Sequence, residues 1–342
     1  MYRRFMGLLL YVFVLALALS GCASQSAPTA APTIPPTAAP TVVPTATPQP
    51  QPSPEPTPTP GGVDVAWELV VKPDVPVVAR VNGVDITTDA YLKELRQQLQ
   101  YYTAFYAMDW NSEEAREFLP SFQDQLVQRL QQVELAQQLA KAEGIELSTD
   151  ELKAASIDAV NEVMRSGRWS TWQDFVDATA TYPGAFDKQV QTSVLFDKLL
   201  ERHGGPDEVE HANIAQIAVT TEDLGKQIVA RLQAGASFAD LAKQYSTDGV
   251  TKSKGGEMGW VPRGLMVPEW DAVAFSLEAG EISDVFQTEY GFHVLKSEGK
   301  ETRVLSGEQA TQVHQAHFLR WFDAEIKKAD IETLVTFSTE GS

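Results

Sequence analysis

The stretch Lys254–Phe275, KGGEMGWVPRGLMVPEWDAVAF, decides how the rest of this chain is interpreted. It opens on the glycine-rich turn GGEMG and then places Met258, Met266 and Trp270 within thirteen residues. It has neither the two-residue alternation of a strand nor the polar periodicity of a long helix. We therefore expect an irregular, loop-built apolar wall of a pocket, closed by a short helix from Glu269 to Phe275.

Two other kinds of site, for phosphate and for metal, can be weighed from the same sequence. A phosphate-binding loop needs a Lys-Ser or Lys-Thr pair at the start of a helix, and GGEMG is followed by WVPRG instead. His314 and His317 lie one helical turn apart, but no third metal ligand is evident. No metal ion or other cofactor is therefore expected, and an exposed or capping role is favoured for both histidines.

The segments before and after Lys254–Phe275 alternate between strand and helix patterns. Strands and helices within about 90 residues predict a compact α+β domain with a small antiparallel sheet. The expected elements are a strand at Ile214–Val219, a helix at Thr221–Gln233, a short helix capped by Ser237, a strand at Glu281–Thr288 and a final strand at Phe292–Lys296.

The region before this domain is mainly helical by the spacing of its apolar residues. It begins with a strand at Val77–Val81 and a turn at Asn82-Gly83, after which Thr88 or Asp89 is expected to cap the first helix. Ser148 and Glu151 have the spacing of a capping box. The expected helices span 91–108, 111–143 (with a break allowed at Pro120), 148–165, a short run near Trp172, and 184–202. A last helix, 307–328, has an apolar face that needs this region as its partner.

The N-terminus has the features of an export signal. Arg3 and Arg4 precede an apolar run, 6–19, that is too short to span a bilayer as a helix. The run ends in Leu-Ser-Gly-Cys, which matches the bacterial lipobox, and Cys22 is the only cysteine of the chain. A lone thiol cannot form an internal disulfide, so lipidation of Cys22 and attachment to the cell membrane are expected.

The composition indicates an extended linker and restricts the kinds of partner that the protein can bind. Residues 23–62 hold 13 of the 20 prolines, a composition that favours an extended spacer and cannot bury a core. The 342 residues carry a formal charge of −19, which argues against nucleic acid as a partner and favours basic, unfolded polypeptides.

The motifs of the α+β domain resemble those of the parvulin class of peptidyl-prolyl cis/trans isomerases. The matching motifs are FADLAKQYSTD (238–248), GGEMGW (255–260), GLMVPEWDAVAFSLEAGEIS (264–283) and YGFHVLK (290–296). The rest of the ordered chain, over about 77–335, resembles exported bacterial foldases that contain a parvulin domain. In those proteins the isomerase domain is inserted into a chaperone module made of an N-terminal helical segment and the C-terminal helix.

The export signal, the composition and this resemblance together divide the chain into five expected segments. They are a lipoprotein signal peptide (1–22), a disordered linker (23–76), a helical chaperone-like domain (77–206), a parvulin-like domain (207–303), and a C-terminal helix packing on the N-terminal domain with a tail (304–342).

The resemblance also implies a site. Met258, Met266, Trp270 and Phe275 would form the proline-binding pocket, with Trp270 standing where Phe is more usual. Asp248, His293 and Thr288 match positions of the polar centre. Gln216 stands where the family has its first histidine, and His211, five residues earlier, would point to the other face of the strand. Glutamine can keep the hydrogen bonds of a histidine, but it cannot titrate.

The expected function is that of a lipid-anchored extracytoplasmic foldase that isomerises X-Pro bonds in newly exported or unfolded polypeptides. An alternative is a holdase whose parvulin domain only binds peptide, and Gln216 is the feature that separates the two. A solute-binding lipoprotein would need two α/β lobes, and the long helical first half argues against it.

Overall fold

The computed structural model describes residues 62–179 and 184–338. The expected signal peptide, Cys22 and the proline-rich part of the linker lie outside the described residues. Contacts divide the chain into two compact units. Unit 1 contains 134–152 and 191–330, and unit 2 contains the other described residues.

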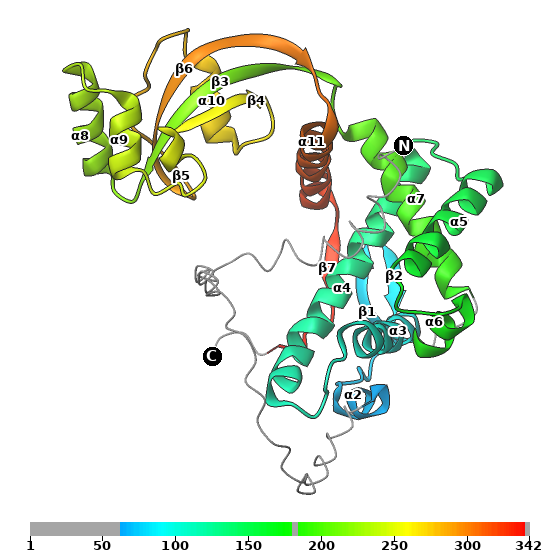
Figure 1. The fold of residues 1–342 in the computed structure, drawn as a ribbon. Helices are drawn as coiled ribbons and strands as arrows, with labels where there is room; N and C mark the ends of the chain where they lie inside the picture. The colour runs from blue at the N-terminus through cyan, green and yellow to red at the C-terminus, as the bar shows by residue number, and fades with distance from the viewer. Residues whose placement is uncertain (1–61, 180–183, 339–342) are drawn as a thin grey trace, which may run out of the picture. The chain divides into compact units, whose positions relative to one another are not determined.

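Unit 1 contains a four-stranded antiparallel sheet of order β4-β3-β6-β5. The two long strands β3 and β6 run side by side along the sheet (Figure 1). This confirms the predicted α+β domain with a small antiparallel sheet. Its elements are β3 (Glu208–Val219), α8 (Glu222–Gln233), α9 (Phe238–Tyr245), the 3-10 helix η2 (Lys252–Lys254), β4 (Glu257–Pro262), α10 (Pro268–Ser276), β5 (Phe286–Thr288) and β6 (Gly291–Val304).

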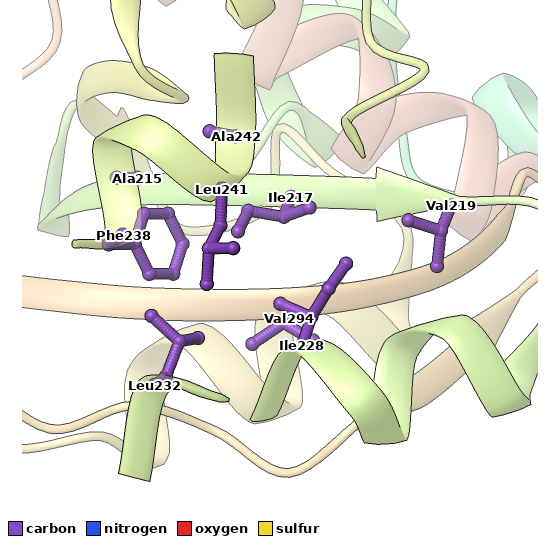
Figure 2. Packing of buried hydrophobic residues seen from close by; sticks show 9 residues of the cluster. All are labelled: Ala215, Ile217, Val219, Ile228, Leu232, Phe238, Leu241, Ala242 and Val294. Carbon is purple, nitrogen blue, oxygen red and sulfur yellow. The ribbon is translucent and has the colours of Figure 1, made fainter. Parts of the chain in front are cut away.

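Both faces of the inner half of this sheet are buried, because α8 and α9 cover one face and α10 covers the other. Successive residues of β3 point to opposite faces. Three residues of the inner half of β3, Ala215, Ile217 and Val219, pack against α8 and α9, and Figure 2 shows side chains from both helices gathered around Ile217 and Val294. The even-numbered residues, among them Ile214, pack against α10 through Trp270. The sheet thus separates a core of structural contacts from a face that carries the candidate pocket residues.

The stretch Lys254–Phe275 is more regular than the sequence predicts. It contains β4, so the expectation of an irregular loop wall was wrong there, although the closing helix was placed correctly and begins at Pro268. The strand pattern is hidden because Ile214 pairs with Gly259 and Ala215 with Glu257, which leaves Met258 as an extra, bulged residue. A bulge breaks the two-residue alternation on which strand prediction depends.

Two other strands differ in length from the predictions. The strand expected at Glu281–Thr288 is only β5, preceded by an isolated bridge between Ile282 and Lys296. The final strand β6 continues to Val304, because Glu208–Val219 pairs with it along its whole length. Charged residues in the outer half of this ladder conceal the strand from a pattern of apolar residues.

Unit 2 contains a second sheet, of order β2-β1-β7, of which the sequence predicts only the strand at Val77–Val81 and the turn after it. Strand β7 (Ile331–Thr333) comes from beyond the last helix and pairs with β1 (Val77–Val81), which also pairs with β2 (Val84–Thr87). The described residues after β7 belong to the same unit. The Phe337 ring stacks on Tyr91 at 5.6 Å, and the Asp124 carboxylate accepts a hydrogen bond from the Phe337 backbone N–H.

Ordered structure begins earlier than the expected end of the linker at residue 76. Helix α2 (Val63–Leu69) buries Ala66, and the backbone N–H and carbonyl of Val71 both bond to the side chain of Gln123. These contacts give α2 a partner in α4 (Glu113–Ala142), so the segment packs within unit 2 in spite of its short length. The predicted boundary at residue 76 rests on the strand-like run at Val77, whereas the proline-rich composition itself ends near residue 62.

The helices of the chain largely match their predicted spans. Their bounds are α3 (Thr88–Tyr106), α4 (Glu113–Ala142), α5 (Thr149–Arg165), α6 (Trp172–Thr179), α7 (Ala185–His203) and α11 (Gly307–Lys328). Ser148 and Glu151 form the predicted capping box. Thr87, and not Thr88 or Asp89, caps α3, because its side chain accepts from the N–H of Ala90. Pro120 does not divide α4.

Two helix faces remain of interest for function. In unit 1, Phe318 and Phe322 of α11 contact Phe196 of α7. In unit 2, Tyr101, Tyr102 and Phe105 of α3 join an aromatic cluster and are half-buried, whereas Tyr106 is 56% exposed. None of the helices within 62–179 and 184–338 is long and apolar enough to cross a membrane.

Candidate functional site

Four polar residues singled out from the sequence lie in one region of the four-stranded domain. Gln216 lies on β3, Asp248 follows α9, Thr288 ends β5 and His293 lies near the start of β6. His293 pairs with Ala218 and Gln216 with Leu295, so Gln216 and His293 lie on the same face of the sheet, the face covered by α10. Antiparallel pairing therefore brings residues that are 77 positions apart in the sequence onto one surface.

Gln216 is the centre of a hydrogen-bonded chain of side chains. Its Nε2 donates to Oδ2 of Asp248 at 2.7 Å, and its Oε1 accepts from the indole Nε1 of Trp270 at 3.2 Å. Its backbone N–H donates to the carbonyl of Gly256 at 2.9 Å. Both ends of the amide are thus bonded, and the residue is 7% exposed. Such a side chain has little freedom to rotate.

Asp248 is held as a carboxylate by several donors. Besides Gln216, the hydroxyl of Thr251 donates to Oδ2, and the backbone N–H of Val250 donates to Oδ1 at 3.0 Å. Burial alone raises the pKa of Asp248, but the hydrogen bonds from Thr251, Gln216 and the backbone outweigh burial, so the pKa lies below its usual value. The site therefore keeps one fixed negative charge at neutral pH.

His293 makes a separate contact with Thr288. The Thr288 hydroxyl lies 2.8 Å from Nε2 of His293 and accepts from the backbone N–H of Tyr290 at 3.1 Å. Among the described residues, Nδ1 of His293 is buried without a hydrogen-bond partner. Burial lowers the pKa of His293, and the negative charge of Asp248 opposes this shift without cancelling it. His293 is therefore neutral at physiological pH.

The four polar residues therefore form two networks and not one. Gln216 and Asp248 belong to one, and His293 and Thr288 to the other, with the Asp248 charge acting on His293 through space. Sequence reasoning missed Thr251 as a donor to Asp248. The signal that could have found it is the spacing: a hydroxyl three residues after an aspartate in a loop is typical of local side-chain turns.

The four apolar candidates share a single cluster, but they differ in exposure. Trp270 and Phe275 are almost completely buried, at 1% and 7%, whereas Met258 and Met266 are partly exposed at the edge of the cluster. The guanidinium of Arg263 lies 4.0 Å from the centroid of the Phe275 ring. The surface open to a ligand is thus provided mainly by the two methionines, and the two aromatic residues support it from below.

The remaining histidines lie away from this site. His211 is buried on β3, its Nδ1 is 3.0 Å from the carbonyl of Val209, and its odd offset from Gln216 puts it on the opposite face. His314 contacts the Gly204 carbonyl at 2.8 Å and Asp207 at 3.1 Å. Within the part of the chain that the structure describes, no three His, Cys, Asp or Glu side chains are grouped so that they could hold a metal ion.

Two family models match this chain. A model described as a PPIC-type PPIase domain matches residues 209–299, and one described as a SurA-like N-terminal domain matches residues 67–200. The first covers most of the four-stranded sheet and every candidate residue from Gln216 to His293. The second covers most of the helical region before it.

Individual proteins with related sequences cover much of the chain. The chain is 32% identical over 230 residues to the foldase protein PrsA of Caldanaerobacter subterraneus subsp. tengcongensis, which covers 65% of this chain and 73% of that protein. It is 32% identical over 158 residues to the chaperone SurA of Hahella chejuensis, covering 42% and 36%. A crystal structure of PrsA from Bacillus anthracis aligns with a TM-score of 0.40 and 21% identity, covering 59% of this chain and 96% of that one.

Proposed function

The chain belongs to the family of PrsA foldases, and we propose that it isomerises X-Pro bonds in exported proteins while they fold. Its substrates are unfolded polypeptides. The observation that carries the proposal is the joining of an apolar surface to a fixed charge. Met258 and Met266 pack in one cluster with Trp270, and Trp270 is hydrogen-bonded through Gln216 to the Asp248 carboxylate.

The chemistry needs no covalent step. Rotation about an X-Pro amide has a barrier of about 18–20 kcal/mol, because resonance is lost when the bond twists. The planar amide carries negative charge on oxygen, and the twisted amide is less dipolar. A pocket that holds the proline ring on Met258 and Met266 and excludes water favours the twisted form. A fixed negative charge at Asp248 adds to this by disfavouring the charge-separated planar form.

The alternative of a holdase without catalysis is favoured by one observation, the glutamine at position 216. A full-length sample should be assayed for cis/trans exchange in a proline tetrapeptide and, separately, for suppression of aggregation of an unfolded client. We expect exchange to be faster than the uncatalysed reaction, which takes tens to hundreds of seconds. If exchange stays at the rate of buffer while aggregation is still suppressed, the protein is a holdase.

The helical regions would serve as the chaperone part of the molecule. The half-buried aromatic residues Tyr101, Tyr102 and Phe105 and the exposed Tyr106 offer an apolar surface on α3 for unfolded chains. The acidic charge of the whole protein would favour basic clients and disfavour nucleic acid. In this proposal, residues 77–206 and the helix of 304–342 hold the client, and residues 207–303 isomerise it.

The proposed cellular location is outside the cytoplasm, on the membrane surface. The lipobox before Cys22 supports lipidation, and the proline-rich residues after it would act as a spacer of up to about 120 Å, at ~3.1 Å per residue. Replacing Cys22 by alanine is expected to move the protein from the membrane fraction to the soluble fraction and to abolish labelling by a fatty-acid probe. A Cys22→Ala chain that stays in the membrane fraction and is still labelled would contradict lipidation at this residue.

A further inference from the structure

The hydrogen bond between Trp270 and Gln216 joins the apolar cluster to the charged network. Trp270 is 1% exposed and lies on α10, and its Nε1 donates to Oε1 of Gln216 at 3.2 Å. At the other end of the amide, Nε2 of Gln216 donates to Asp248 at 2.7 Å. A phenylalanine at position 270 would fill most of the same apolar space, but it could not make this bond.

Chemistry alone fixes which way the Gln216 amide points. An indole N–H can only donate a hydrogen bond, and an ionised carboxylate can only accept one. The amide oxygen must therefore face Trp270, and the amide nitrogen must face Asp248. The flipped amide would place donor against donor at Trp270 and acceptor against acceptor at Asp248, which leaves buried polar groups unpaired at both ends.

We infer that Trp270 is a positioning residue that locks Gln216 in the orientation that donates to Asp248, and that this lock fits only an uncharged side chain at position 216. The expected effect on the rate rests on the proposed isomerase function. The fixed orientation of the Gln216 amide, which we call the lock, follows from the hydrogen bonds alone. A neutral histidine at position 216 could accept from Trp270 and donate to Asp248. A protonated histidine could not, since its second N–H would face the indole N–H.

The lock has a consequence for the dependence of activity on pH. The titratable groups near Gln216 are Asp248, from the loop after α9, and His293, from the neighbouring strand β6; Trp270 on α10 and Thr251 are neutral. The pKa of Asp248 and the pKa of His293 both lie below their usual values, so at neutral pH Asp248 is charged and His293 is neutral. Because position 216 cannot titrate, the isomerase rate of the natural chain stays constant between about pH 6.5 and 8, where a histidine begins to protonate.

The test introduces a titrating group with and without the indole donor. Gln216→His is made in the natural chain and in the Trp270→Phe chain, and the titration of the introduced histidine is followed by NMR in full-length protein. We expect this histidine to protonate at a pH about one unit lower when Trp270 is present, because the indole N–H opposes the second proton. Equal titration in the two chains would overturn the lock, whether or not the protein has isomerase activity.

The second readout is catalysis. Trp270→Phe by itself is expected to lower kcat/KM for a proline tetrapeptide about tenfold, because a buried amide loses one of its two bonded partners. Trp260→Phe is the matched control, since Trp260 lies on β4 and is contacted by Arg303 instead of the Gln216 network. Thermal unfolding of both variants shows whether they are folded at the assay temperature. A folded Trp270→Phe chain with the kcat/KM of the control would overturn the positioning role.

Discussion

Replacing Asp248 by alanine is expected to lower kcat/KM for a proline tetrapeptide about a hundredfold, the scale of losing an electrostatic group that acts on the reacting bond. The carboxylate is the acceptor for Gln216, Thr251 and the backbone N–H of Val250. The substitution removes the fixed negative charge and leaves these donors without an acceptor. Loss of both the charge and the geometry makes this the largest expected effect of any side chain on activity.

Two further variants make the result specific. Asp284→Ala removes an exposed carboxylate from the same domain and should change kcat/KM by less than about twofold. Asp248→Asn keeps an acceptor for Thr251 but has no charge, so it separates charge from hydrogen bonding. An Asp248→Ala chain that is folded and has nearly the natural kcat/KM would exclude Asp248 from the catalytic network.

The same carboxylate makes stability depend on pH in a defined direction. The pKa of Asp248 is lower in the folded than in the unfolded chain, so the unfolded chain binds more protons between the two values. Its contribution to the free energy of unfolding is present above the unfolded pKa of about 3.9 and is lost as the pH falls through the folded pKa. Acid unfolding curves of the natural and Asp248→Ala chains should therefore converge at low pH.

Gly256→Ala is expected to destabilise the four-stranded domain by about 3 kcal/mol or more, a cost that combines a steric clash with backbone strain. A Cβ at this position would lie 2.4 Å from the carbonyl oxygen of Gln216, which is backbone and cannot move aside. Gly256 also has a φ of +88°, a conformation that an alanine rarely adopts. The damage is centred on Gln216, because the Gly256 carbonyl accepts the Gln216 N–H.

Two glycines of the same domain serve as controls. Gly280 has a φ of +87° but open space around its Cβ position, so Gly280→Ala measures backbone strain alone, about 1 kcal/mol. Gly249 has neither positive φ nor a close neighbour, so Gly249→Ala should be nearly neutral. Native-state hydrogen exchange of the β3 amides reports the local free energy of opening in the full-length chain. The clash is absent if Gly256→Ala costs no more than Gly280→Ala.

Local sequence signals determined much of the fold. Helical spacing predicted α11 at its observed bounds, Gly307–Lys328, and the capping box at Ser148 placed the start of α5. Alternation of apolar residues predicted the inner half of β3, because the side chains of adjacent residues are buried on opposite faces. These features depend on residues close in sequence, which is why they can be read without a structure.

Features that depend on distant residues could not be read in this way. Strand β7 has only three residues and becomes a strand because it pairs with β1, about 250 positions away. The bulge at Met258 hides β4, because it breaks the alternation that marks a strand. In each case the backbone conformation is stabilised by a partner that local propensity does not identify.

The same difference between local and long-range features holds for the stretch Lys254–Phe275 and the candidate site. The residues themselves identified an apolar segment with Met258, Met266 and Trp270, and the resemblance of the sequence to parvulins pointed to Gln216, Asp248, Thr288 and His293 as polar candidates. Only the tertiary structure decided that Trp270 donates to Gln216, that Gln216 donates to Asp248, and that His293 pairs separately with Thr288. A hydrogen bond needs its two atoms within about 3 Å, and that distance is set by the pairing of β3 with β6 and by the packing of α10 on the sheet.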